Sequence, residues 1–163
     1  MTVPNVSEDT VIDPTTWGNI VANELNDRGI KAVASVTSGN TAFDVGGSVD
    51  IVGLSLNVTT KADRYYRVKA ELYYYVLGSG SESVGNISII DSIAGQIQSS
   101  QVFVPGAGTS NAVKVTAEVI AIFGAGTRTI KVVGQKMTGT GTISTLSSTN
   151  AAMQLYVEDV GPV

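Results

Sequence analysis

The side chains that carry most protein chemistry are missing from this sequence. Its 163 residues include no histidine and no cysteine, so it lacks the usual general base near neutral pH, the commonest metal ligand and the thiol nucleophile. Histidine-dependent triads, thiol catalysis, structural zinc sites and facial-triad iron sites are therefore excluded. Catalysis would need a carboxylate pair, a lysine or an oxygen-ligated Ca²⁺ or Mg²⁺. The composition thus favours a structural or binding role over an enzyme.

Two groups of acidic residues are candidates for an acid and base pair or for cation ligands. Glu158 and Asp159 are adjacent, but neighbours on an extended strand point to opposite faces, so we interpret them as a solvated strand end. Four aspartates near turns could hold Ca²⁺, namely Asp44, Asp50, Asp63 and Asp91. Their spacing matches no calcium loop, and turn or cap roles are expected instead. No catalytic, metal or cofactor residue is predicted.

Three glycine-containing runs superficially resemble phosphate-binding loops, at residues 106–108, 124–126 and 138–142. None carries the lysine of a phosphate loop, and none opens a helix after a strand. We interpret them as hairpin turns or bulges. A glycosidase, which needs two carboxylates facing each other across a cleft, is disfavoured because most acidic residues fall in turns.

Tyrosines and basic side chains gather in one segment. Five of the six tyrosines are Tyr65, Tyr66, Tyr73, Tyr74 and Tyr75. Tyrosine suits a strand core, a subunit interface or a sugar-binding surface, and the sequence leaves these alternatives open. The neighbouring basic residues are Lys61, Arg64, Arg67 and Lys69, which could meet an acidic surface, with Glu24 and Asp27 of a neighbouring subunit as candidates. The predicted partner contacts are Trp17, Arg64, Tyr65, Arg67, Tyr73 and Tyr75.

The elements that must position these residues begin with an extended arm over residues 1–13. Asp13 then resembles an N-cap and Pro14 a first helical residue, which predicts a helix over 14–28. Its apolar face consists of Trp17, Ile20, Val21 and Leu25, at helical spacing. Trp17 either plugs the end of its own domain or anchors the chain on a partner.

After Gly29 the apolar period changes to two, which is typical of strands. In the segment 64–77 one face is predicted to consist of Tyr66, Val68, Ala70, Leu72, Tyr74 and Val76. Similar runs recur with turns every 8 to 12 residues, a pattern of all-β sandwiches and barrels. We predict an all-β, jelly-roll-like antiparallel β-sandwich, with residues 14–163 forming a single domain that includes the helix.

Composition narrows the range of partners. Charged residues make up 15% of the chain and hydrophobic residues 43%; the charged share is low against roughly 25% in ordinary domains, which favours surface hidden against partners. The net charge of -4 and the lack of a basic stripe argue against nucleic acid. No segment approaches the roughly 20 apolar residues of a membrane helix, and the first residues lack a signal peptide pattern, so assembly in a cytoplasm is expected.

Three segments resemble tailed-phage virion proteins, particularly those of actinobacterial phages. They are DPTTWGN at residues 13–19, YYRVKA at 65–70 and LYVEDVGP at 155–162. The resemblance implies a non-enzymatic, jelly-roll-like subunit, commonly a homotrimer, on the virion exterior. Two roles follow: a capsid decoration (cement) protein bound to the major capsid protein, or a minor tail or fibre-type protein that binds host surface glycans. The chain has no long repetitive shaft, which favours decoration of the capsid exterior.

Overall fold

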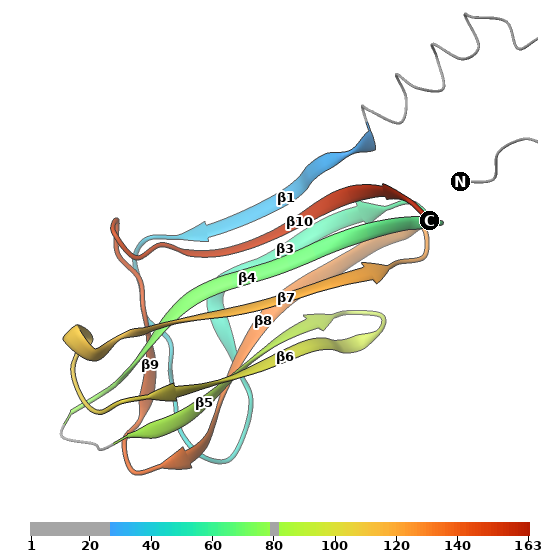
Figure 1. Ribbon diagram of the computed structural model, residues 1–163. Helices are drawn as coiled ribbons and strands as arrows, with labels where there is room; N and C mark the ends of the chain where they lie inside the picture. Colours follow the sequence, from blue (N-terminus) through green and yellow to red (C-terminus); the bar gives the residue numbers. More distant parts are fainter. Residues whose placement is uncertain (1–26, 79–81) are drawn as a thin grey trace, which may run out of the picture.

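The computed structural model describes residues 27–78 and 82–163, and strands make up most of them. The elements are β1 Gly29–Val36, β2 Ala42–Phe43, β3 Val49–Thr60, β4 Arg64–Val76, β5 Ser83–Asp91, β6 Gly95–Val104, the 3-10 turn η1 Thr109–Asn111, β7 Val113–Ile122, β8 Gly126–Gly139, β9 Ile143–Leu146 and β10 Met153–Pro162 (Figure 1). The predicted arm 1–13 and nearly all of the predicted helix 14–28 lie outside the described residues. Within the described ranges, no helix is long and apolar enough to cross a membrane.

The strands form two antiparallel sheets. Sheet A has the order β1-β10-β4-β7, and β9 and β2 extend it beyond the end of β10. Sheet B has the order β3-β8-β5-β6. The pairs β5–β6, β4–β7, β3–β8 and β1–β10 are nested in the sequence, as when one long hairpin is rolled up on itself. This connectivity is that of a jelly roll, which confirms the predicted all-β jelly-roll-like sandwich.

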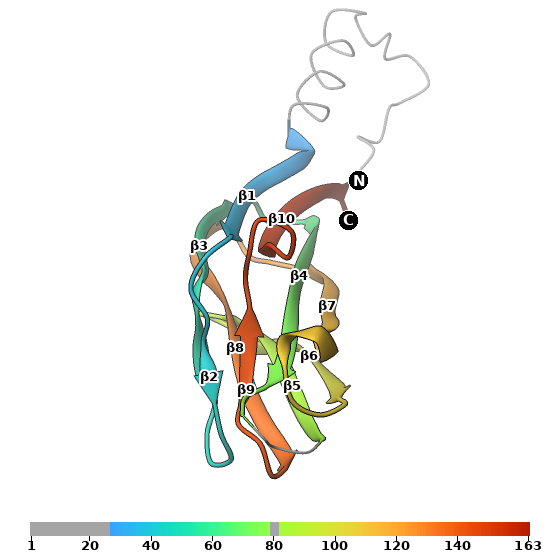
Figure 2. The same cartoon turned by 90° about the vertical axis from the view of Figure 1, so that its left-hand side faces the viewer.

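The edges of the two sheets lie against each other. The edge strand β1 contacts β3, and β7 contacts β6, where Gln98 Nε2 donates to the Glu118 carbonyl at 3.0 Å. Figures 1 and 2 show β9 at the end of the sandwich away from the C-terminus, with β2 beside it. At the opposite end, Gly29 pairs with Asp159 and Val163 N–H donates to the Asp63 carbonyl. The chain therefore enters and leaves the sandwich at the same end.

The apolar residues that alternate along the predicted strands are the ones that form the core. On β4 the predicted inward residues are all at most 1% exposed: Tyr66, Val68, Ala70, Leu72, Tyr74 and Val76. On β7, Val115 and Ala117 are buried while Lys114, Thr116 and Glu118 are exposed. Period-two alternation gives each strand one apolar face, and packing the two apolar faces together forms the core. The glycine runs at 106–108, 124–126 and 138–142 contain bend residues, but each connects strands of different sheets, namely β6 to β7, β7 to β8 and β8 to β9. The expectation of hairpin turns there is therefore wrong.

Two buried ion pairs lie at the end of the core where the chain enters and leaves the sandwich. Arg64 Nε donates to Asp159 Oδ2 at 2.6 Å, and Arg128 donates to Asp91 Oδ2 at 2.6 Å. The Arg128 guanidinium also lies 4.3 Å from the centre of the Phe123 ring. Because Asp159 is only 2% exposed, its interpretation as part of a solvated strand end is wrong. The predicted opposition of neighbouring side chains is confirmed, since Glu158 points outward to Arg67.

Candidate interaction surface

The outer face of sheet A, turned away from sheet B, is built by the register of β1, β10, β4 and β7. Tyr65 lies opposite Ile122 of β7. Arg67 lies between Ile120 of β7 and Glu158 of β10. Opposed residues in a ladder lie about 5 Å apart and interact side by side. The register therefore sets rows of side chains across the whole face.

Charged residues along the middle of this face form a ladder of ion pairs. Arg67 pairs with Glu118 at 3.3 Å and with Glu158 at 3.0 Å. Glu71 pairs with Lys69 at 2.8 Å and with Lys114 at 3.2 Å. Three bases and three acids take part, so the ladder carries no net charge.

Apolar side chains flank this ladder at both edges of the face. The first group, named here the β7 patch, consists of Tyr65, Ile120 and Ile122, which are 39%, 55% and 53% exposed. The second, the β1 patch, consists of Ile30 and Val33, which are 64% and 56% exposed. Each of these residues stands in the outward phase of its strand. Large apolar side chains grouped on one face mark a surface that packs against another molecule.

The outer face of sheet B differs in chemistry. It is lined by small polar side chains that hydrogen bond to one another: Thr129 donates to Asn57 at 2.7 Å, and Ser99 donates to Asn86 at 2.7 Å. The strands of this sheet also carry exposed apolar side chains, among them Val52 on β3, Phe103 on β6 and Met137 on β8, at 66%, 52% and 41% exposure. The polar part of this face, whose groups bond to one another, is suited to contact with water. The candidate interaction surface is therefore the outer face of sheet A.

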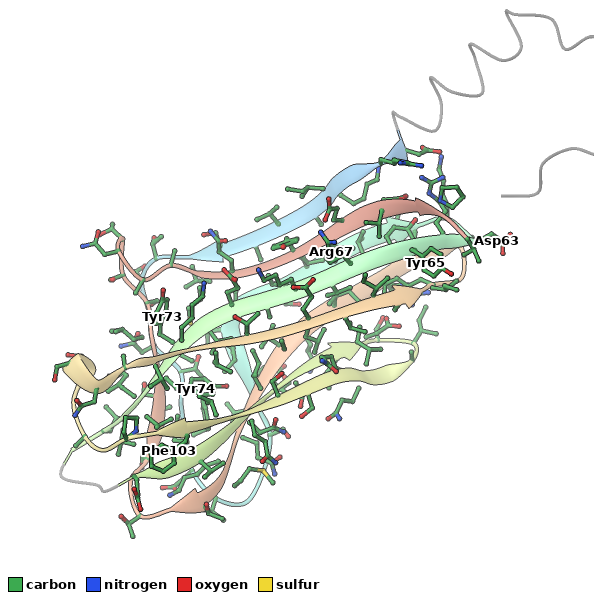
Figure 3. The ribbon with its side chains drawn as sticks, viewed as in Figure 1. Asp63, Tyr65, Arg67, Tyr73, Tyr74 and Phe103 are labelled. Carbon is green, nitrogen blue, oxygen red and sulfur yellow. The ribbon has the colours of Figure 1, made fainter. Side chains whose placement is uncertain are left out.

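The predicted contact residues are distributed between this face and the interior. Tyr65, Arg67 and Tyr73 point outward from β4, and Figure 3 shows Tyr73 toward the opposite end of the strand from Tyr65. Arg64 and Tyr75 are 4% and 8% exposed, so neither offers its side chain to a partner. Tyr75 has the outward phase, yet η1 lies against β4 and the neighbouring Val76 carbonyl accepts the Gly108 N–H at 3.0 Å. Trp17 lies outside the described residues.

The basic cluster is paired within the chain. Lys61 donates to Asp27 at 2.6 Å, so this aspartate, which the sequence suggested as a contact in a neighbouring subunit, is held by its own chain. Arg64 is paired with Asp159, and Arg67 and Lys69 belong to the ladder. Since each of these four basic charges has an acidic neighbour, this cluster does not form a positive patch for an acidic partner.

The sequence reading missed the two apolar patches. A signal existed for the β7 patch, because Ile120 and Ile122 fall in the polar phase of the 112–123 alternation. An apolar residue in the polar phase of a strand is exposed unless another segment of the chain or another molecule covers it. For Ile30, a bulge between Ile30 and Ala32 sets its orientation, and local alternation does not reveal such a bulge.

The aspartates considered as cation ligands have other roles. Asp91 accepts the N–H groups of Ile93 and Ala94 in a turn, as predicted, and pairs with Arg128. Asp44 and Asp50 pair with Lys136 and Lys131. Across residues 27–78 and 82–163, acidic side chains do not gather in threes as a metal site would need.

Acid should weaken the fold through Asp44. The hydrogen bond from Lys136, helped by those from Val45 N–H and the Thr142 hydroxyl, lowers the pKa of Asp44 from 3.8 to about 2. Asp44 therefore binds a proton more readily in the unfolded chain than in the folded one. Its contribution to the free energy of unfolding is complete above pH 3.8 and is lost as the pH falls toward about 2. We expect urea midpoints to fall across that window and Asp44→Asn to flatten the slope. An unchanged slope in the variant would contradict the assignment.

Comparisons with known proteins give structural likeness alone. No family model matches the chain, and no curated protein matches it. Eiger TNF from S. frugiperda is similar at 14% identity and a TM-score of 0.47, over 83% of this chain and 96% of that one. A chain of the T13 viral particle of IBDV is similar at 14% identity and a TM-score of 0.36, over 80% of this chain and 36% of that one. An Arthrobacter globiformis isomalto-dextranase is similar at 16% identity and a TM-score of 0.32, over 78% of this chain and 22% of that one.

These likenesses are distant. This chain spans about a third of the IBDV chain and about a fifth of the dextranase chain. One fold serves many unrelated functions, and the three proteins named are a TNF, a viral particle and a glycan-directed enzyme. The jelly-roll assignment rests on the strand order described above, and the function must be inferred from the surface.

Proposed function

We propose that this protein is a non-enzymatic structural subunit of a tailed-phage virion, a trimeric decoration protein that binds the major capsid protein on the capsid exterior. The observation that carries this proposal is the division of surface chemistry between the two sheets. Apolar side chains gather on the outer face of sheet A, while much of sheet B presents small polar groups that bond to one another, with Val52, Phe103 and Met137 as exposed apolar residues on its strands. Such a molecule has one face to pack and one to leave in water.

The paired charges support the same role. The charged residues of the ladder and both buried arginines are paired with opposite charges of the same subunit. Attachment of the subunit to the capsid would therefore depend on apolar contact and shape. A trimer on a symmetric shell site multiplies weak contacts of this kind. The three segments that resemble actinobacterial phage virion proteins support the choice of a phage capsid as the shell.

The test is the copy number of the chain in purified virions, measured against the major capsid protein by quantitative mass spectrometry with labelled peptide standards. We expect a number that follows the capsomer count. A handful of copies per virion would assign the protein to the tail and make host glycans the partner to examine. Absence from virions would overturn the proposal altogether.

A further inference from the structure

The two apolar patches of sheet A lie in the half of its outer face that is nearer to the point where the chain enters the sandwich. Ile30 of the β1 patch and Ile120 of the β7 patch are the two ends of one row of opposed residues that crosses β10 and β4. Tyr65 of the β7 patch follows Arg64, whose guanidinium lies 3.9 Å from the carboxylate of Asp27 (Figure 3). Farther from this end the face is polar, and one of its rows consists of Ser35, Gln154, Glu71 and Thr116. Both patches therefore lie close to the residues that precede Asp27.

Two basic side chains beside the β1 patch lack an acidic partner among the described residues. Residues 27–78 and 82–163 contain all ten basic residues of the chain, and eight of these pair with an acidic side chain in the same ranges. The other two are Arg28 and Lys31, which stand on either side of Ile30 in the sequence. The segment 1–26 has no basic residue and carries four acidic ones, Glu8, Asp9, Asp13 and Glu24. This segment therefore has the charge that complements the two basic side chains.

The residues that precede Asp27 also have an apolar pattern and a length that suit the two patches. Their sequence predicts an amphipathic helix whose apolar face consists of Trp17, Ile20, Val21 and Leu25. A helix over residues 14–26 would be about 20 Å long, whereas β1 and β7 lie about 14 Å apart across β10 and β4, at about 4.8 Å for each strand spacing. Gly29 has a φ of 100°, a conformation that favours glycine and allows a chain to change direction after a helix. One helix can therefore reach across both patches.

We infer that residues 14–26 of the same chain cover the β1 and β7 patches in the free subunit, with the apolar side of the predicted helix packed on sheet A. An amphipathic helix must bury its apolar face against another element, and these patches offer it an apolar surface next to its own end. Between the patches the helix would cross the pair formed by Arg67 and Glu158, whose charges cancel. The position of the patches, the length of the segment and its charge all agree with this contact.

This contact deepens the proposed function, and its role rests on that function although the contact itself does not. The face that the segment covers is the one we assign to the capsid. The segment would therefore shield the apolar patches of free subunits from one another, and it would have to release them when the subunit attaches to the shell.

Trp17 provides the readout, because it is the one tryptophan of the chain and belongs to the apolar face of the predicted helix. The experiment measures its emission maximum and its quenching by acrylamide in the purified full-length chain. We expect the blue-shifted emission of a buried indole, and quenching several-fold weaker than in the urea-unfolded chain. Emission typical of a solvated indole in the folded wild-type chain would overturn the inference.

Variants of the two patches test where the indole is buried. Each of two variants places glutamates, which repel an acidic segment, in one patch: Ile120→Glu with Ile122→Glu, and Ile30→Glu with Val33→Glu. Both should shift the emission to that of a solvated indole and raise the quenching several-fold. The matched control, Phe103→Glu at an exposed position on sheet B, should change neither. A buried indole that neither patch variant exposes would place Trp17 elsewhere and overturn the inference.

Two controls make this result specific. Far-ultraviolet circular dichroism checks that each variant is folded, and Ile120→Thr with Ile122→Thr, which suits a strand, replaces a glutamate variant that fails to fold. The variant with glutamates in the β7 patch is also refolded from urea together with an excess of Trp17→Phe, a chain that has no tryptophan and keeps both patches. Docking within one chain predicts that the solvated emission persists in this mixture. Return of the blue-shifted emission would show that the segment lies on a neighbouring copy and would overturn the inference.

The shielding role has a test of its own. Ile20→Asp with Leu25→Asp should release the segment, so that the full-length variant binds several-fold more of a dye for apolar surfaces than the wild type and attaches to undecorated shells at a lower concentration. Unchanged dye binding, or attachment only at a higher concentration, would overturn this role.

The outcomes for the inference and for the proposed function are distinguishable. A solvated Trp17 in a chain that is present on virions at a capsomer-linked copy number would overturn the inference alone. A Trp17 that is buried on the patches of a chain missing from virions would overturn the proposed function alone, because the contact within the chain needs no shell.

Discussion

Replacing Asp159 by Asn is expected to destabilise the protein by about 3 kcal/mol, because it removes the nearer carboxylate of the buried Arg64 and leaves only Asp27, at 3.9 Å. Asp159 and Arg64 are 2% and 4% exposed and lie 2.6 Å apart. The second carboxylate oxygen of Asp159 accepts the Gly161 N–H at 3.0 Å, so an amide also disturbs the bulge of β10. The measurement is the urea unfolding free energy at one fixed chain concentration, since assembly shifts apparent stability.

The adjacent residue provides the control. Glu158 pairs with Arg67 on the outer face, and both side chains are about a third exposed, so Glu158→Gln should cost no more than about 1 kcal/mol. A double variant, Arg64→Met with Asp159→Leu, should recover much of the loss, because apolar residues of similar volume often replace a buried pair without penalty. Equal effects of Asp159→Asn and Glu158→Gln would contradict the buried position of this pair.

Replacing Tyr74 by Ala should cost about 3–5 kcal/mol, as for other large aromatic residues removed from a core. Tyr74 is fully buried, and its ring meets Phe43 edge-on at 5.2 Å between centroids. The ring reaches from sheet A to sheet B, where its hydroxyl donates to the Asn86 carbonyl at 3.2 Å. A Cβ on Gly85 would come within 3.0 Å of the ring, so the glycine makes the room that the tyrosine fills.

Tyr74→Phe separates packing from hydrogen bonding. Burial raises the pKa of Tyr74, so its hydroxyl remains a donor throughout the ordinary pH range. Losing this one bond should cost about 1 kcal/mol, a small part of the effect of the alanine. The unfolding free energies of the two variants, measured side by side, test this division. A phenylalanine as harmful as the alanine would indicate that the hydroxyl, and not the ring, stabilises the contact between the sheets.

Local alternation predicts which side of a strand is buried, and it does so well here. Leu72 and Val115 both lie in the core as their phases require, because a period of two follows from strand geometry alone. The same rule separated Glu158 from Asp159. The interpretation of Asp159 as part of a solvated strand end was wrong, because alternation predicts the direction of a side chain and not which residues lie in that direction.

What the sequence determined by itself was the all-β class, the alternating faces and the turns, because each depends on residues within a few positions of one another. The tertiary structure alone decided the contacts between distant residues. Arg64 finds Asp159 across 95 positions, and Tyr65 meets Ile122 only through the register of β4 with β7. Register and strand order are fixed by burying all the apolar faces at once, so no single segment contains them, and the patches at the two edges of sheet A become visible only after the chain has folded.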